Sequence, residues 1–213
     1  MKKIDWSLYL VTDRALSRGL STAAVVEAAI RGGATVVQYR EKSLSTKLMI
    51  EEAGAIAEVC RRLGALFIVN DRLDVALAVE ADGLHVGQDD MPAALARRLL
   101  GPDRILGVSA GSVEEAREAV AAGADYIGAS PIFATPTKTD AGPALGLAGL
   151  SAVAAALALP VVAIGGINAA NARSLIEAGA AGLAVVSAIV AADDVEGSAR
   201  SLRSIIDAAG RAK

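Results

Sequence analysis

The stretch Thr35-Val36-Val37-Gln38-Tyr39-Arg40-Glu41-Lys42 contains the pattern from which the fold can be read. Its first half is short and apolar, which predicts a buried strand. Its second half is polar, so Arg40, Glu41 and Lys42 stand where that strand ends. Two cations beside a strand end form a place that can hold an anion.

The same pattern recurs along the chain: a helical segment ends at glycine, a short apolar run follows, and polar residues come next. Glycine after a helix adopts the left-handed conformation that other residues resist. Continuous apolar runs are typical of parallel strands buried on both faces. Eight such strands are predicted, at residues 8–11, 35–38, 66–69, 84–86, 105–108, 126–129, 161–164 and 183–186.

Eight strands that alternate with helical segments in 213 residues predict one domain, a (β/α)8 TIM barrel over residues 1–213. A doubly wound open sheet is the alternative. The even size of the units favours the barrel, and so does the lack of a G-x-G-x-x-G motif after the first strand. Ser45, Ser112 and Asn168 are expected to cap helices.

Composition restricts the classes of partner. The net charge is −3 and no basic run occurs, which argues against nucleic acid. Residues 141–172 carry no charge, but Pro160 and the pair Gly165-Gly166 interrupt them. A helix at 147–159 and a buried strand are therefore predicted there rather than a membrane span. The N-terminal residues lack the apolar core of a signal peptide, so a soluble, cytoplasmic protein is expected.

The single cysteine and the single histidine are both expected to be structural. Cys60 cannot form an intrachain disulfide, and it shares a helix face with Met49, Ala53 and Ile56. His85 lies within a predicted strand. The oligomeric state is left open, and a homo-oligomer is compatible with the sequence.

In a TIM barrel the active site lies at the carboxyl ends of the strands. Arg40, Lys42 and Lys138 are cations in two of these loops, and together they favour an anion site over ordinary surface charge. Asp71 and Asp90 follow neighbouring strands and could share a Mg²⁺ ion. Equally, each of these two carboxylates could cap the helix that follows it.

Loops seven and eight suggest a second anion site. Gly165-Gly166 and Val186-Ser187 follow the last two strands, where this fold usually binds phosphate. A tight turn is the alternative explanation for the glycines. Neither a Ser/His/Asp nor a Cys/His set is visible, so ionisation of a pyrophosphate ester and capture by a neutral nucleophile would fit.

The residues at these strand ends resemble those of the thiamine-phosphate synthase family, and the resemblance extends over nearly the whole chain. The resemblance rests on runs of residues at the predicted strand ends: 9–13, 38–42, 70–71, 85–88 with Asp90, 107–109, 135–138 and 164–167. It implies a TIM barrel that joins a pyrimidine pyrophosphate to a thiazole phosphate by a dissociative mechanism. The products are thiamine phosphate and pyrophosphate.

The resemblance also implies roles for individual residues. The metal ligands for Mg²⁺ are Asp71 and Asp90. The residues that contact the pyrimidine pyrophosphate are Gln38, Tyr39, Arg40, Glu41, Lys42, Asn70, Ser109 and Lys138, of which Arg40, Lys42, Ser109 and Lys138 are assigned to catalysis. The residues that contact the thiazole phosphate are Thr135, Pro136, Thr137, Gly166, Val186 and Ser187.

Two other functions remain as alternatives. The related thiazole tautomerases carry a histidine just after the serine of loop five, where this chain has Ser109-Ala110-Gly111. A barrel that binds thiamine phosphate without turnover would be expected to lose its carboxylates or Lys138, which this chain keeps. Residues 130–147 are a candidate lid. Glu41 is expected to orient a neighbouring cation, or to contact water on the metal, rather than to touch phosphate.

Overall fold

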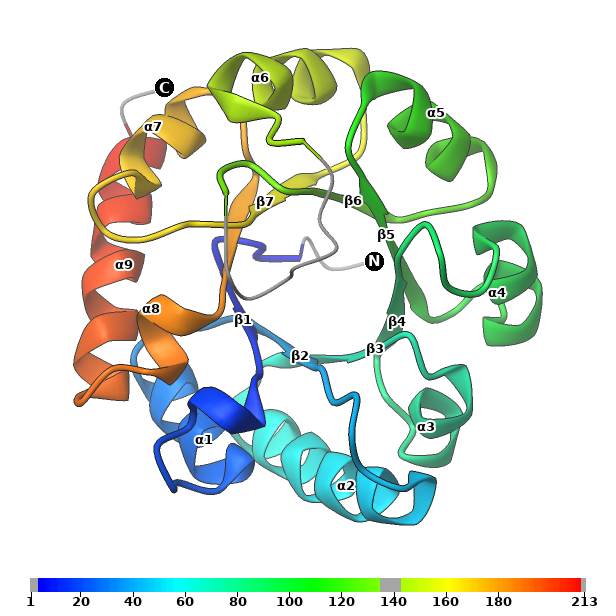
Figure 1. Ribbon diagram of the computed structural model, residues 1–213, viewed down its shortest axis with the longest axis vertical. Helices are drawn as coiled ribbons and strands as arrows, with labels where there is room; N and C mark the ends of the chain where they lie inside the picture. The colour runs from blue at the N-terminus through cyan, green and yellow to red at the C-terminus, as the bar shows by residue number, and fades with distance from the viewer. Residues whose placement is uncertain (1–3, 135–142, 212–213) are drawn as a thin grey trace.

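The computed structural model describes residues 4–134 and 143–211. Within them, eight parallel strands close into a barrel in chain order, and the last strand pairs with the first. Figure 1 shows the strands at the centre with the helices arranged around them. The predicted (β/α)8 barrel is therefore confirmed, and the open sheet is wrong.

All eight predicted strands are present, and their ends differ from the prediction by at most two residues. Ser109 lies within the fifth strand rather than after it. The strands are β1 (Leu8–Val11), β2 (Val36–Tyr39), β3 (Leu66–Asn70), β4 (Gly83–Val86), β5 (Ile105–Ala110), β6 (Tyr126–Ala129), β7 (Val161–Ile164) and β8 (Gly182–Val185).

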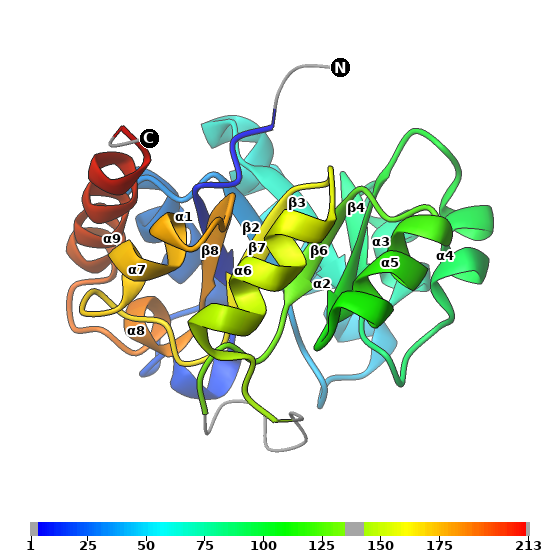
Figure 2. The same cartoon turned by 90° about the horizontal axis from the view of Figure 1, so that it is seen from above.

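The helices follow the strands and cover the outside of the barrel (Figure 2). They are a 3₁₀ turn η1 (Arg14–Leu16), α1 (Thr22–Arg31), α2 (Thr46–Leu63), α3 (Leu73–Ala78), α4 (Ala93–Leu100), α5 (Val113–Ala121), α6 (Gly146–Ala156), α7 (Ala172–Glu177), α8 (Ser187–Val190) and α9 (Val195–Gly210).

Two of the three predicted helix caps are confirmed. The hydroxyls of Ser45 and Ser112 accept hydrogen bonds from backbone N–H groups in the first turns of α2 and α5. The third cap is wrong, because α7 begins only after Asn171. The side chain of Asn168 instead accepts from the N–H of Ala170 in the turn before that helix.

The uncharged stretch is divided as predicted. It forms α6, a connection through Pro160, and the buried strand β7, although α6 stops three residues before the predicted end. Among the helices in the described parts of the chain, none has the length and apolar character needed to cross a membrane. Cys60 is buried on the inner face of α2 beside Met49, Ala53 and Ile56, as expected.

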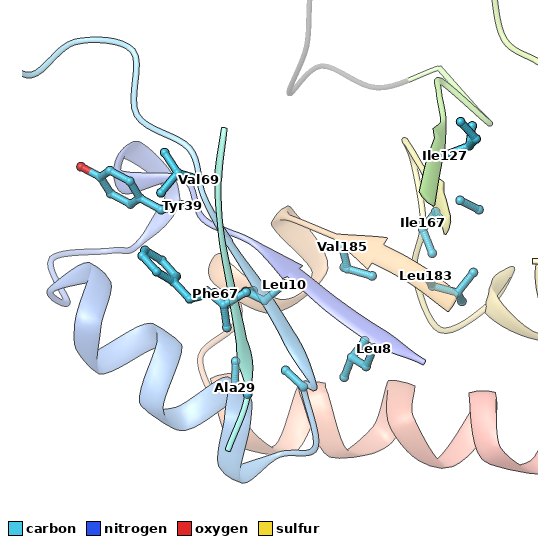
Figure 3. Packing of buried hydrophobic residues seen from close by; sticks show 14 of the residues in the cluster. Leu8, Leu10, Ala29, Tyr39, Phe67, Val69, Ile127, Ile167, Leu183 and Val185 are labelled. Atoms are coloured by element: carbon cyan, nitrogen blue, oxygen red, sulfur yellow. The ribbon is translucent and has the colours of Figure 1, made fainter. Parts of the chain in front are cut away.

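Successive side chains of each strand point alternately into the barrel and towards the helices. The outward residues form an apolar layer that includes Leu8, Leu10, Phe67 and Val69 (Figure 3). The inward residues form a separate and more aromatic cluster that contains Trp6, Tyr9 and Tyr126. The two layers explain why the strands are apolar on both faces.

Trp6 closes the amino-terminal end of the barrel. It is 7% exposed, and its ring centroid lies 4.5 Å from that of Tyr126. Gly182 allows this approach, because a Cβ there would lie 1.8 Å from the carbonyl oxygen of Trp6. The Trp6 ring thus fills the barrel interior at its amino-terminal end, below Tyr126.

Candidate active site

A cavity of about 440 Å³ lies at the carboxyl ends of the strands. Every strand contributes residues to its wall. Ten of the predicted site residues line it: Gln38, Arg40, Lys42, Asn70, Asp71, Asp90, Ser109, Gly166, Val186 and Ser187. Residues that are far apart in the sequence therefore meet at the carboxyl ends of the strands, where the active site of a TIM barrel is expected.

Four predicted site residues lie outside the part of the chain that the structure describes: Thr135, Pro136, Thr137 and Lys138. The same holds for residues 135–142 of the candidate lid at residues 130–147. Of the three predicted cations, the structure therefore places Arg40 and Lys42. Both stand on the connection that leaves β2.

Hydrogen bonds from Thr12 fix the backbone where β2 ends. The buried hydroxyl of Thr12 accepts a hydrogen bond of 3.0 Å from the N–H of Arg40. The N–H of Thr12 donates to the carbonyl oxygen of Gln38 at 2.9 Å. The strand end that carries the cations is thus held on both sides of Tyr39, so the guanidinium begins from a fixed position at the cavity wall.

Two predicted contact residues do not line the cavity. Tyr39 points outwards into the layer under the helices (Figure 3), where its hydroxyl donates to Glu52 on α2 at 2.9 Å. Glu41 accepts from both the N–H and the hydroxyl of Ser43. In this structure the Tyr39 side chain packs under the helices, and the carboxylate of Glu41 stabilises its own turn.

The carboxylates of Asp71 and Asp90 lie together in the cavity. Burial raises the pKa of Asp71 to about 7, and a hydrogen bond and like charge from Asp90 add to this effect. Lys42 and Arg40 oppose it, with Lys42 Nζ 3.9 Å from the Asp71 carboxylate. Two carboxyl groups this close need a shared proton or a cation between them.

Neither carboxylate caps the helix that follows it. The residues that precede α3 and α4 are Arg72 and Pro92, and no side chain caps either helix. Asp71 instead has a φ of 59°, in the left-handed region that residues other than glycine rarely adopt. Such strained backbone conformations cluster at functional sites. Asp90 accepts a hydrogen bond of 2.8 Å from the N–H of Gly87, which fixes the turn after β4.

The glycines of loop seven are explained first by close packing. Gly165 and Gly166 have φ angles of 107° and 66°. A Cβ on Gly166 would lie 2.8 Å from the side chain of Phe133, on the loop after β6. Both glycines also line the cavity beside Val186 and Ser187, where the short helix α8 begins. The tight turn and the anion site are therefore compatible with each other.

A chain of hydrogen bonds forms the floor of the cavity. The side-chain amide of Gln38 donates to the hydroxyl of Tyr9 at 2.9 Å, and that hydroxyl lies 2.8 Å from the hydroxyl of Tyr126. The Tyr126 hydroxyl lies 2.8 Å from Nδ1 of His85, whose Nε2 lies 2.9 Å from the hydroxyl of Ser109. We call these five residues the floor network. All five line the cavity.

Comparisons with known proteins fit this geometry. Residues 8–189 match the family model described as thiamine monophosphate synthase. The chain belongs to this family. It is 62% identical over 203 residues to the thiamine-phosphate synthase of Chloroflexus aurantiacus, a match that covers 95% of this chain and 94% of that protein. It is 54% identical to the thiamine-phosphate synthase of Moorella thermoacetica, over 95% and 96% of the two chains.

A solved structure supports the same assignment. The thiamine phosphate pyrophosphorylase from Pyrococcus furiosus superposes with a TM-score of 0.89 at 41% identity, over 97% of this chain and 98% of that one. Like the other members of the thiamine-phosphate synthase family, this protein is a transferase.

The sequence missed most of the floor network. Tyr9 and Tyr126 were not predicted as site residues, and His85 was expected to be structural although it lines the cavity. Counting every second residue along the strands identifies Tyr9 as inward-facing, and Tyr39, directly after the inward-facing Gln38, then faces outwards. The contact between His85 and Ser109 had no signal in the sequence, because the two residues come from different strands.

Proposed function

We propose that this protein is a Mg²⁺-dependent thiamine-phosphate synthase. It transfers the (4-amino-2-methylpyrimidin-5-yl)methyl group from its pyrophosphate ester to the ring nitrogen of 4-methyl-5-(2-phosphoethyl)thiazole, or of its carboxylated form. The products are thiamine phosphate and pyrophosphate. The observation that carries this proposal is one cavity that combines two cations, two paired carboxylates and the phosphate-binding loops of the fold.

The cations of the β2 connection suit the leaving group. In the proposed reaction the bond between the methylene carbon and the pyrophosphate oxygen breaks, and its electron pair leaves with the pyrophosphate. Arg40 and Lys42 stand where that negative charge develops, and preorganised cations in a closed site stabilise such charge effectively. By family resemblance, Lys138 contributes a third cation.

The paired carboxylates suit a magnesium ion. Mg²⁺ prefers oxygen ligands and is commonly held by one or two carboxylates together with substrate phosphate oxygens. Asp71 and Asp90 meet this requirement, and a cation between them would relieve the repulsion from Asp90, which adds to burial in raising the pKa of Asp71. When bound, the ion would neutralise part of the pyrophosphate charge. Within the described residues no cluster of three acidic, histidine or cysteine ligands occurs, so substrate oxygens and water would complete the shell.

The thiazole phosphate would bind at the wall formed by the loops after β7 and β8. Its phosphate would sit against Gly166, Val186 and Ser187, at the loops where this fold commonly binds phosphate. By family resemblance, Thr135, Pro136 and Thr137 add contacts on this side. The ring nitrogen forms the new bond to carbon with its own lone pair and carries no proton, so this step needs no general base.

The direct test is a turnover assay with purified protein, both substrates and Mg²⁺. We expect thiamine phosphate and pyrophosphate in equal amounts, and a loss of product when the metal is chelated. Product formation without Mg²⁺ would contradict the metal assignment alone. If neither product rose above a control without enzyme, the proposed function would be wrong.

A further inference from the structure

The floor network has a feature that the proposed reaction does not itself require: its hydrogen bonds have a direction. Each hydroxyl in it has one hydrogen to donate, and a neutral imidazole has one donor and one acceptor nitrogen. The direction at one end of such a chain therefore decides the direction at the other end. The ends are Gln38 on β2 and Ser109 on β5, and both line the cavity.

The direction follows from the amide of Gln38. Its Nε2 donates to Tyr9, and within the described residues Tyr126 is the remaining partner that can accept the hydrogen of the Tyr9 hydroxyl. The Tyr126 hydroxyl then donates to Nδ1 of His85. That histidine must carry its hydrogen on Nε2 and donate it to the oxygen of Ser109.

The ends of the network consequently present defined groups to the cavity. Because Nε2 of Gln38 is engaged by Tyr9, Oε1 is the end of the amide that can accept a hydrogen bond from a ligand. Because the Ser109 oxygen accepts from His85, its hydrogen is the group that can be donated. A ring with an amino group and an unprotonated ring nitrogen matches this acceptor and donor.

Burial keeps the direction fixed. Tyr9 and Tyr126 are each 1% exposed, and burial raises the pKa of both hydroxyls well above the ordinary tyrosine value, so both remain protonated donors. Two glycines make room for the rings. A Cβ on Gly107 would lie 2.2 Å from the Tyr126 ring, and one on Gly128 would lie 3.0 Å from the imidazole of His85.

We propose that Tyr9, Tyr126 and His85 are positioning residues that set the hydrogen-bond direction of the floor network and thereby select an aminopyrimidine over its 4-oxo analogue. This inference rests on the proposed function. The oxo analogue presents a carbonyl in place of the amino group, so that carbonyl faces Oε1 of Gln38 unless the amide turns over. In the intact network that turn reverses every bond and moves the hydrogen of His85 from Nε2 to Nδ1.

The first test needs no substrate. The chain has one histidine, so a long-range ¹H–¹⁵N spectrum of tag-free protein reports on His85 alone. We expect a neutral ring with its hydrogen on Nε2 in the wild type, and a changed pattern in Tyr126→Phe. Tyr39→Phe is the matched control, since it removes a buried hydroxyl that bonds Glu52 outside the network. Hydrogen on Nδ1 in the wild type would overturn the proposal.

The second test measures selectivity. Dissociation constants are measured for the aminopyrimidine pyrophosphate and its 4-oxo analogue by titration calorimetry. In Tyr126→Phe, Tyr9 can reorient alone, so we expect the preference for the amino compound to fall roughly 10-fold, equivalent to one hydrogen bond. It should be unchanged in Tyr39→Phe. If Tyr126→Phe does not fold, Tyr9→Phe interrupts the same chain.

The two tests separate failure of this inference from failure of the proposed function. An unchanged preference in a folded Tyr126→Phe variant would overturn the inference while leaving the function intact. If the wild-type protein bound neither pyrimidine, the proposed function and the selectivity would both be wrong. The histidine spectrum would still decide the direction of the network.

Discussion

The two ends of the barrel use charge in opposite ways. At the amino-terminal end, the guanidinium of Arg97 donates to the carbonyl oxygens of Gly101, Arg104 and Gly123 and forms an ion pair with Asp125. The same carboxylate accepts from the N–H of Leu106. Both charged groups are therefore bonded to other groups of the protein. These bonds connect α4 to the starts of β5 and β6.

At the carboxyl end the charges are matched only in part. Asp71 and Asp90 face each other, burial and the neighbouring Asp90 raise the pKa of Asp71, and Lys42 Nζ lies 3.9 Å from the Asp71 carboxylate. Placing two carboxylates side by side lowers the stability of the protein, and it leaves both groups able to bind a ligand. The difference shows that one fold can keep its structural and its functional charges at opposite ends, so that they can be altered separately.

The largest effect on stability is expected at the amino-terminal end. Arg97→Ala removes four contacts of a half-buried charge and should lower the free energy of unfolding by about 2 kcal/mol. This corresponds to a fall in melting temperature of about 4–8 °C for a chain of this size. Activity per folded molecule should be unchanged. Arg98→Ala, an exposed neighbour on the same helix, is the control and should alter neither quantity.

A smaller effect is expected from magnesium at the carboxyl end. At a free Mg²⁺ concentration ten times its dissociation constant, binding should stabilise the wild type by about 1.4 kcal/mol. Asp71→Asn with Asp90→Asn should remove this response without lowering the stability of the metal-free protein, because it removes the repulsion. Thermal melts with and without Mg²⁺ measure both. If Mg²⁺ stabilised the double variant as much as the wild type, the metal would have to bind at a site other than Asp71 and Asp90.

The smallest effect is expected in the outward layer. Tyr39→Phe removes the hydrogen bond to Glu52 and should cost about 1 kcal/mol in chemical denaturation. Turnover should match the wild type, because the side chain points away from the cavity. A rise in the Michaelis constant for the pyrimidine substrate would instead restore Tyr39 as a contact residue.

The sequence was sufficient to predict the barrel and much of its rim. Glycine after several of the helices and short apolar strands define the βα units, and polar residues that follow the strands line the cavity, as Arg40 and Asp71 do. The sequence could not show which way a side chain turns once it leaves the strand, so Glu41 was assigned to the site although its carboxylate bonds its own turn. Tyr39 was assigned by family resemblance, although alternation along the strand places its side chain outwards.

The floor of the cavity was harder to predict than its rim. Tyr9 and Tyr126 are separated by 117 positions in the sequence and meet only because the barrel closes. Room for the Tyr126 ring depends on Gly107, and room for the His85 ring depends on Gly128, and both look like ordinary strand glycines in the sequence. Contacts that depend on closure of the whole barrel leave no local pattern.

The central claim is that the carboxyl end of the barrel carries out the transfer, and one comparison tests it most directly. Initial rates of thiamine phosphate formation are measured for the wild type and for Asp71→Asn at equal protein concentration, with melting curves as a check on folding. We predict a fall of at least about 100-fold with no loss of thermal stability. Wild-type turnover by a folded Asp71→Asn variant would contradict the account.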